Sequence, residues 1–508
     1  MNTKDIQQKS IAISGNINKS EIYPNDFKFI NPSLNRFDTP ISLSTEFQHI
    51  ENHLILNNVL LTTQDNGIHI DGDYSISDLG SDNMELKALN RDITLRQKAL
   101  HPYLSLINIP SSALDIISPL GDIHLQGILA YQSGQFETTS DIESSIGKLS
   151  ADIKYDKNHR LSGHLSTPSL SLSEILPSLD LRKISMDVDL DILFSEVIPS
   201  GTLKGEISHI EYKKLQLNKI QIDGEFNDNG YSGKISIQDP QIDMNFNGIV
   251  KGFQDKDYHL NATVDLKKFK PQTFGIEGNA SQNSYDLTAT ANIQGSSLSE
   301  MTGIIQLSDL HIHTPSTHYT FKNVKLDIKR NSLLQKDFRI ESDIAGISLK
   351  GSMDYNTIFT SIQKIPNAIL PIYDKEKYLN TASHDQFEFD IILNDHPYLH
   401  SFLKESFSFE SPIRLIGNVD CTNDKYDVSV QSESFTYQNH TINNIKLDYS
   451  GNQNHYTISG QASYPNDDKV YHANIQATGI GRELHSDINW SIAQGKPMLG
   501  HLIIDGEV

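Results

Sequence analysis

The chain has 508 residues, with 42 Lys and Arg against 64 Asp and Glu, which gives a formal net charge of −22. This balance excludes the basic footprint of a nucleic-acid-binding protein, so no nucleic-acid partner is expected. A hydrophobic content of 37% is too high for a disordered chain, and the length exceeds one ordinary domain. The single cysteine, Cys421, excludes an intrachain disulfide and a thiolate zinc site, and we expect it to be a small core residue.

The first hundred residues contain short runs in which apolar and polar residues alternate. Ile68 and Ile70, for example, flank His69, and Ile93 and Leu95 are spaced in the same way. A period of two is typical of a half-buried antiparallel strand. Residues 1–100 are therefore predicted to form an N-terminal strand block.

Short helices are predicted to bracket a second strand block, residues 101–180. One helix opens at His101-Pro102-Tyr103-Leu104, because proline suits the first helical turn. Another is predicted within Leu170–Leu179, where Ser173 is a suitable N-cap. Residues 181–355 then form a central block of repeated strands.

The clearest alternation in the chain lies within the central block, from Gly201 to Leu266. The runs are separated by turn sequences at Asn227–Gly230 and Asp239-Pro240. We expect the apolar members of these strands to line one face of a sheet. These residues are Ile220, Ile222, Phe226, Ile235, Ile237, Ile242, Met244, Phe246, Leu260, Val264 and Leu266.

A helix-containing segment, residues 356–405, interrupts the strands. Its main helix is predicted over Asn356–Leu370, with a kink at Pro366. The apolar stripe of that helix consists of Ile358, Phe359, Ile362, Ile365 and Ile369. The helix either caps the sheet or lines and gates a groove. A second His-Pro-Tyr-Leu sequence at His396 opens another short helix, and residues 406–508 form a C-terminal strand block.

A sheet that is apolar on one face must bury that face. Stacked β-sandwiches would do so, but they usually leave linkers, and none is evident in the sequence. The helices are too few and too short to cover the sheet. We therefore expect an all-β fold in which one long antiparallel sheet curls into a U-shaped apolar groove of the β-taco type, with a few short amphipathic helices. Periodicity alone leaves sandwiches open.

The sequence motifs do not favour an enzyme. His311-Ile312-His313 places two imidazoles on one strand face, a spacing that metal sites use, but the surroundings predict two solvent-facing histidines rather than a metal hydrolase. Gly479-Ile480-Gly481 lacks the following Lys and Ser or Thr of a phosphate loop. Asp187 and Asp189 alternate with apolar residues, as the polar face of a strand does. We expect no catalytic residues, metal or cofactor.

Several runs resemble the TamB/AsmA-like family of bacterial envelope proteins, in particular the long TamB-like translocation and assembly module proteins of the Bacteroidetes type. The resemblance covers roughly residues 50–480 and rests on patterns of strands, turns and helices. The runs that carry it are Leu170–Leu176, Ile210–Gly224, Ile235–Gly248 and Ile340–Gly351 with the helix that follows.

The resemblance implies a periplasmic bridge whose hydrophobic groove conducts phospholipid between the inner and outer membranes, and which supports outer-membrane biogenesis and protein assembly. It implies phospholipid acyl chains as partners. Through a C-terminal region outside this sequence, it also implies an outer-membrane assembly protein of the TamA/BamA type. We expect an internal portion of a protein that is anchored in the inner membrane. The alternative is a structural or adhesive β-repeat protein that acts as a spacer or binding module.

Overall fold

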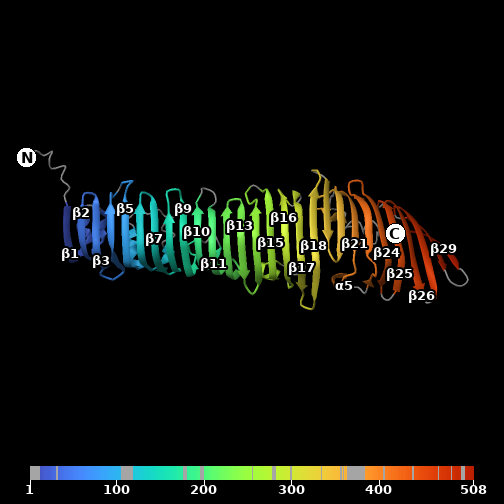
Figure 1. Cartoon of the computed structure of the whole chain (residues 1–508), viewed down its shortest axis with the longest axis horizontal. Coiled ribbons are helices and arrows are strands. Elements are labelled where there is room, and N and C mark those ends of the chain that lie inside the picture. The colour runs from blue at the N-terminus through green and yellow to red at the C-terminus, as the bar shows by residue number, and fades with distance from the viewer. Residues whose placement is uncertain are drawn as a thin grey trace, which may run out of the picture. The chain divides into compact units, whose positions relative to one another are not determined.

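A computed structural model is all-β, and the 29 strands of the residues that it describes form one antiparallel sheet. Figure 1 shows these strands side by side. The chain divides into two compact units, Met1–Asn245 and Phe246–Val508. The structure describes residues 12–29, 32–79, 81–104, 118–175, 180–194, 199–254, 256–276, 282–297, 300–332, 335–354, 357–358, 360–362, 384–403, 407–437, 440–452, 454–466, 468–481, 483–492 and 498–507. The predicted all-β class and the antiparallel sheet are confirmed.

In the first unit each strand pairs with the strands before and after it in the sequence. This is the simplest antiparallel connectivity, and a short turn joins most of these pairs. The strands are β1 (Ala12–Ile22), β2 (Ile41–Ile50), β3 (His53–Thr63), β4 (Ile68–Ser77), β5 (Glu85–Leu95), β6 (Ile123–Gln132), β7 (Gln135–Ser144), β8 (Gly147–Tyr155), β9 (Arg160–Ser171), β10 (Leu181–Leu193), β11 (Ser200–Tyr212), β12 (Leu215–Asn227) and β13 (Gly230–Gln238). Strand β14 (Ile242–Lys251) contains the junction between the units.

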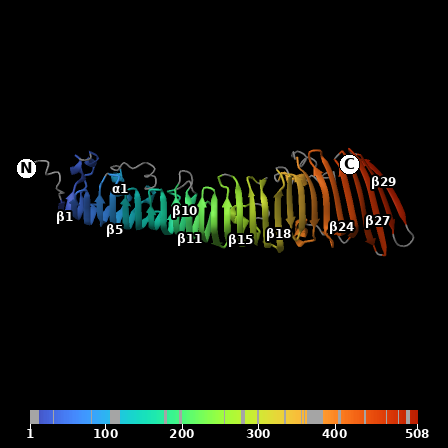
Figure 2. The same cartoon turned by 45° about the horizontal axis from the view of Figure 1, so that its top comes forward.

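The second unit continues the same scheme, and Figure 2 shows its strands in chain order. One departure is that β21 pairs with β23, while the two-residue β22 pairs with the C-terminal end of β24. The strands are β15 (Tyr258–Phe269), β16 (Ser284–Gly295), β17 (Thr302–His313), β18 (His318–Arg330), β19 (Gln335–Glu341), β20 (Ala345–Ser352), β21 (Gln386–Leu393), β22 (Phe407–Ser408), β23 (Ile413–Asp420), β24 (Lys425–Tyr437), β25 (His440–Gly451), β26 (His455–Asn466), β27 (Lys469–Ile480), β28 (Glu483–Ile492) and β29 (Leu499–Glu507).

The two turns predicted in the central block are confirmed. Between β12 and β13, the side-chain oxygen of Asn227 accepts hydrogen bonds from the backbone N–H groups of Asn229 and Gly230, each at 2.9 Å. After β13, the carboxylate of Asp239 accepts from the N–H of Gln241 at 2.8 Å. In both turns a side-chain oxygen takes the place of a backbone carbonyl as the hydrogen-bond acceptor. This stabilises the backbone conformation in which the chain reverses direction.

The short helices were predicted less well. The described residues include η1 (Pro24–Phe27), η2 (Pro32–Arg36), α1 (Gln97–Leu104), η3 (Ser118–Leu120), η5 (Pro271–Phe274) and α5 (Pro397–Leu403). Helix α5 begins at its proline, as predicted from the second His-Pro-Tyr-Leu sequence. Helix α1 begins at Gln97, so Pro102 lies in its last turn and the predicted start at His101 is wrong.

The helix predicted within Leu170–Leu179 is also wrong in its described part. Strand β9 continues to Ser171, and the chain then makes a turn in which the N–H of Ile175 donates to the carbonyl of Leu172 at 3.1 Å. Strand pairing with β10 reaches Leu170 and Ser171, which outweighs the local N-cap signal of Ser173. Residues 176–179 lie outside the described part of the chain.

Candidate functional site

Strands β12 and β13 bring their apolar residues to one face. Residues that lie directly opposite each other on neighbouring strands project to the same side of a sheet. The opposed pairs are Ile220 with Ile237, Ile222 with Ile235, and Phe226 with Tyr231. The alternate residues Gln221, Asp223 and Glu225 are exposed, whereas Ile237 is 8% exposed. The sequence therefore folds into strands with one buried and one solvated side.

The same arrangement holds in β14 to β16. In the second unit Leu260 lies opposite Ile293, Val264 opposite Ala289, and Leu266 opposite Leu287. In β14 Ile242 is 6% exposed, and Met244 and Phe246 are half-buried. All eleven residues predicted for this face are thus buried or half-buried. We call this side of the strands, in each unit, the apolar face.

Aromatic rings cover glycines on the apolar face of the second unit. Phe389 lies opposite Gly417, and a Cβ added to Gly417 would be 2.8 Å from the Phe389 Cζ. Tyr456 lies opposite Gly479, and a Cβ there would be 2.1 Å from the Tyr456 Cζ. A ring lying over a glycine fills the space that a missing side chain leaves. Sequence reasoning missed these pairs, because they depend on the register of the strands.

Between β20 and β26 the apolar face carries a closely packed cluster. Leu349, Val419, Tyr426 and Tyr449 are each 2% exposed. Further members of the cluster are Met353, Ile358, Phe387, Phe389, Val428 and Tyr456. Burial raises the pKa of Tyr449 to about 12. We call this set the β20–β26 cluster.

The predicted groove-edge helix contributes to this cluster. Ile358 and residues 360–362 are helical. Ile358 is 5% exposed within the cluster, and Ile362 packs against it. Phe359, Ile365 and Ile369 lie outside the described residues. The two described members of the stripe therefore cover the apolar face, a position that both a cap and a gate would occupy.

A buried carboxylate fixes this helical turn to the sheet. Asp385 is 3% exposed and accepts hydrogen bonds from the Asp354 N–H at 2.8 Å, the Thr357 hydroxyl at 2.8 Å and the Ser361 hydroxyl at 2.5 Å. Ser361 is fully buried. A buried carboxylate is costly unless donors surround it, and these three donors offset that cost. We call this arrangement the Asp385 anchor.

Lys336, on β19, lies near the Asp385 anchor and is 7% exposed. Its burial lowers the pKa of the ammonium group, while the Asp354 and Asp385 carboxylates oppose that shift. Sequence reasoning missed the whole anchor. Asp354 and Asp385 are 31 residues apart, and neither belongs to a motif with a known spacing.

Helix α5 covers another part of the apolar face in the second unit. Phe321 of β18 is 5% exposed. The ring of Tyr398 meets Phe321 edge-on at 5.7 Å between centroids, and the His396 ring stacks on Phe321 at 5.1 Å. The second His-Pro-Tyr-Leu sequence thus supplies two rings to the sheet. This contact explains why a short helix follows β21 at this point.

Cys421 packs against the β20–β26 cluster and is partly buried. Its N–H donates to the carbonyl of Asp385 at 2.9 Å. The backbone of Cys421 therefore lies next to Asp385, and its side chain packs among those on the apolar face. This is the environment expected of a small core residue.

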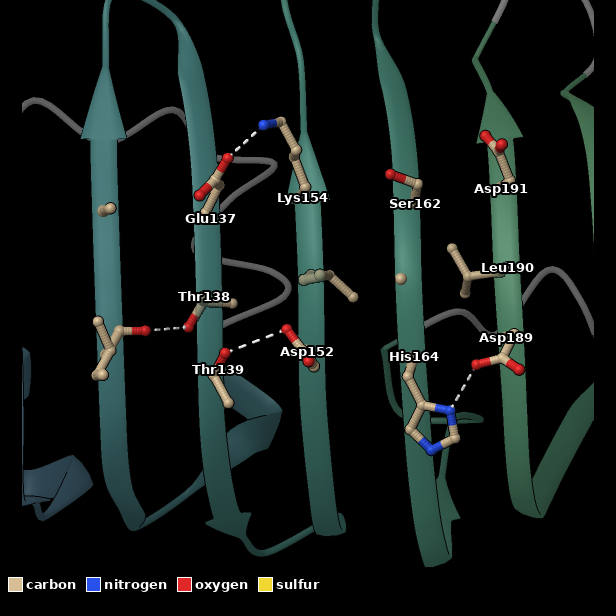
Figure 3. Close-up of a pocket in the computed structure, with 14 residues that line it drawn as sticks. Glu137, Thr138, Thr139, Asp152, Lys154, Ser162, His164, Asp189, Leu190 and Asp191 are labelled. Carbon is tan, nitrogen blue, oxygen red and sulfur yellow. Dashed lines mark hydrogen bonds and ion pairs between the residues drawn. The ribbon is translucent and has the colours of Figure 1, made fainter.

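The polar side of the first unit contains a hollow of about 680 Å³ across β6 to β10 (Figure 3). Its charged residues are paired between neighbouring strands. Lys154 forms an ion pair with Glu137, and Arg160 forms one with Asp191. Figure 3 also shows His164 beside Asp189. The His164 Nδ1 lies 2.9 Å from a carboxylate oxygen of Asp189. Pairs of opposite charge at cross-strand positions stabilise the sheet, so these groups are already engaged with one another.

The two histidines of β17 lie on the polar side, as the sequence predicted. His313 Nε2 lies 2.8 Å from a carboxylate oxygen of Asp286, and His311 Nδ1 lies 2.9 Å from the Thr320 hydroxyl. Their side chains are 49% and 35% exposed. Among the residues that the structure describes, no group of three or more His, Cys, Asp or Glu side chains is arranged to hold a metal ion.

These features define an all-β protein whose sequential antiparallel strands have an apolar face in each unit, covered in places in the second unit by short helical turns. Comparison of the chain with family models, with curated proteins and with solved structures found no match. Within the described ranges, no helix combines the length and the hydropathy that a membrane crossing requires.

Proposed function

We propose that this protein is a segment of a periplasm-spanning bridge whose apolar face conducts phospholipid between the inner and outer membranes. In this proposal the sheet curls around the acyl chains as a U-shaped groove. The observation that carries it is the one-sided burial of the eleven predicted face residues, with exposed polar neighbours between many of them. The resemblance to TamB/AsmA-like proteins supplies the location and the link to outer-membrane biogenesis and protein assembly.

The physical chemistry of lipid transfer suits such a face. Exposing an acyl chain to water costs about 0.8 kcal/mol per methylene, which is on the order of 10 kcal/mol for a whole chain. Aliphatic side chains such as Ile220 and Ile222 in the first unit, and Val264 in the second, remove most of that cost where the acyl chain contacts them. Because these residues offer no directional polar contacts, a chain can slide along them.

In this proposal the protein is not an enzyme and needs no cofactor. Its partners are phospholipid acyl chains and, through a region outside this sequence, an outer-membrane assembly protein of the TamA/BamA type. It would act in the periplasm as part of a protein anchored in the inner membrane.

Site-specific photo-crosslinking tests the proposal. A benzophenone amino acid is placed at Ile222 or Val264 on the apolar face, and at their exposed neighbours Gln221 or Thr263 as matched controls. Each variant is expressed in a bacterial envelope, irradiated and analysed by mass spectrometry for attached lipid. Phospholipid adducts are expected at Ile222 and Val264 only. Absence of adducts from both face positions would refute lipid conduction.

The alternative, a structural or adhesive β-repeat protein that acts as a spacer, is favoured by the β20–β26 cluster. There the apolar face is filled by its own side chains, as in a closed core, and Leu349 and Val419 are each 2% exposed. A spacer would copurify without phospholipid. Native mass spectrometry of protein purified from an envelope therefore distinguishes the two functions.

A further inference from the structure

The helical turn over the β20–β26 cluster, together with Met353 and Asp354 before it in the sequence, has two chemically different sides. Its apolar side carries Met353, Ile358 and Ile362, which pack in or against the cluster. Its polar side carries Asp354, Thr357 and Ser361, which meet Asp385. We call these six residues the plug.

The spacing of the plug residues produces the two sides. Ile358 and Ile362 are four residues apart, as are Thr357 and Ser361, so each pair lies on one side of a helical turn. The Ser361 N–H donates to the Thr357 carbonyl at 2.9 Å, and the Ile358 N–H to the Asp354 carbonyl at 2.8 Å. The sequence thus sets an apolar contact and a polar contact side by side.

The apolar side of the plug occupies the surface that an acyl chain would use. Met353 and Ile358 are each 5% exposed and belong to one cluster with Phe387 and Val419. A branched aliphatic side chain and an acyl chain offer a sheet the same kind of contact. Lipid could therefore reach this stretch of the apolar face only if the plug moved.

Hydrogen bonds from the polar side of the plug to a buried carboxylate are an unusual way to hold a permanent cap on the sheet. A cap that never moved would be held as well by apolar packing, because buried charged and polar groups rarely add net stability. Hydrogen bonds to Asp385 instead hold the plug in one defined position, and water can replace them when the plug moves away from the sheet. The three donors and the nearby Lys336 make that position specific.

We propose that the plug is a built-in closure of the apolar face, latched by Asp385, and that an entering acyl chain releases it. This inference rests on the proposed lipid-conducting function for its trigger, whereas the latch itself does not depend on lipid. The latch and the trigger can therefore be tested separately.

The chain contains a reporter for the latch, because Cys421 is its single cysteine, packs against the β20–β26 cluster and donates its backbone N–H to the Asp385 carbonyl. Without lipid, the rate of Cys421 modification by N-ethylmaleimide is measured in the full chain, with circular dichroism as the check on folding. Asp385→Ala should raise the rate by about ten-fold, because it removes the acceptor of several buried hydrogen bonds. Ser361→Ala should raise it by a smaller factor.

Asp390→Ala is the matched control, because Asp390 lies on β21, the strand that begins one residue after Asp385, and pairs with Arg414 on the polar side. It should leave the Cys421 rate unchanged. A folded Asp385→Ala protein that reacts at the native rate would overturn the latch. If Asp385→Ala does not fold, the rate of Cys421 modification in Ser361→Ala is the test. A rate equal to that of the wild type would then overturn the latch.

The trigger is tested by hydrogen exchange of the wild-type chain with and without vesicles of phosphatidylethanolamine and phosphatidylglycerol. Exchange in peptides that contain Thr357 to Ile362 should rise several-fold with vesicles, while peptides from β12 should not exchange faster. Unchanged exchange in the plug, together with lipid adducts at Ile222, would refute the release but not lipid conduction. Missing adducts at Ile222 and Val264 would refute conduction, while the Cys421 rates would still report on the latch.

Discussion

The ring of Phe389 takes the place of a side chain at Gly417. The two residues face each other on β21 and β23, and Phe389 is 3% exposed. Gly417 in turn lies opposite Val428 of β24, so the ring reaches over the glycine toward the next strand. The cluster is therefore continuous across a position that has no side chain of its own.

Replacing Gly417 by alanine should destabilise the second unit by about 1–3 kcal/mol, because an added methyl group forces the ring or the backbone to move. A Cβ at Gly417 would lie 2.1 Å from the Asp427 carbonyl oxygen and 2.8 Å from the Phe389 ring. Thermal unfolding followed by circular dichroism measures the change. Gly346→Ala is the control, because a Cβ there meets only the Ile392 Cβ at 3.9 Å. Equal midpoints for the two variants would contradict the role of the ring.

The period of two in the sequence predicts which side chains share a face, because the alternation of apolar and polar residues is visible within each strand separately. Ile222 and Val264 needed no knowledge of their partners to be placed on the apolar face. Asn227 likewise predicts its turn from local hydrogen bonding. These parts of the fold depend on neighbours in the sequence.

Contacts between distant residues escaped prediction. The Phe389 and Gly417 pair depends on strand register, and the Asp385 anchor joins residues on either side of a segment of about thirty residues. The start of α1 was misplaced because Pro102 was the strongest local signal. Gln97 to Leu100 have high helix propensities, and the helix begins with them although Pro102 has no backbone N–H to donate within it.

Introducing a charge should discriminate between the two sides of β15. Val264→Asp should destabilise the protein by about 2–4 kcal/mol, because an unpaired carboxylate would lie on the apolar face. Thr263→Asp, on the exposed side of the same strand, should change stability by less than about 0.5 kcal/mol. Urea unfolding measures both variants. A larger loss for Thr263→Asp would show that the faces have been assigned the wrong way round.

The ion pair between Asp390 and Arg414 should make the free energy of unfolding of the second unit depend on pH in the acidic range. Two hydrogen bonds, of 3.0 and 2.7 Å, join the groups. The hydrogen bond from Arg414 lowers the pKa of Asp390 below its usual 3.8. The pair therefore stabilises the fold above about pH 4, and this contribution is lost as the pH falls through the folded-state pKa.

Arg414→Gln should lower the thermal midpoint slightly at neutral pH, since both groups are partly exposed. The difference from the wild type should vanish in acid, below the folded-state pKa of Asp390. In an Asp390→Asn background the same substitution should show no such pH dependence. A difference that persists in strong acid would mean that Arg414 acts through packing and not through charge.

His209 should show the opposite dependence on pH. The hydrogen bond with Asn218, at 2.8 Å, raises the pKa of His209 above 6.5, and Glu211, at 3.3 Å, adds to the shift. A raised pKa means that the protonated histidine stabilises the fold fully below pH 6.5, and that this contribution is lost as the pH rises through the folded-state pKa.

NMR titration of the His209 ring in the labelled chain measures that folded-state pKa directly. Glu211→Gln should lower it, because it removes a negative charge beside the ring, whereas Glu225→Gln, an equal charge change at an exposed position on β12, should not. A His209 titration that is the same in all three proteins would rule out the carboxylate of Glu211 as a cause of the shift.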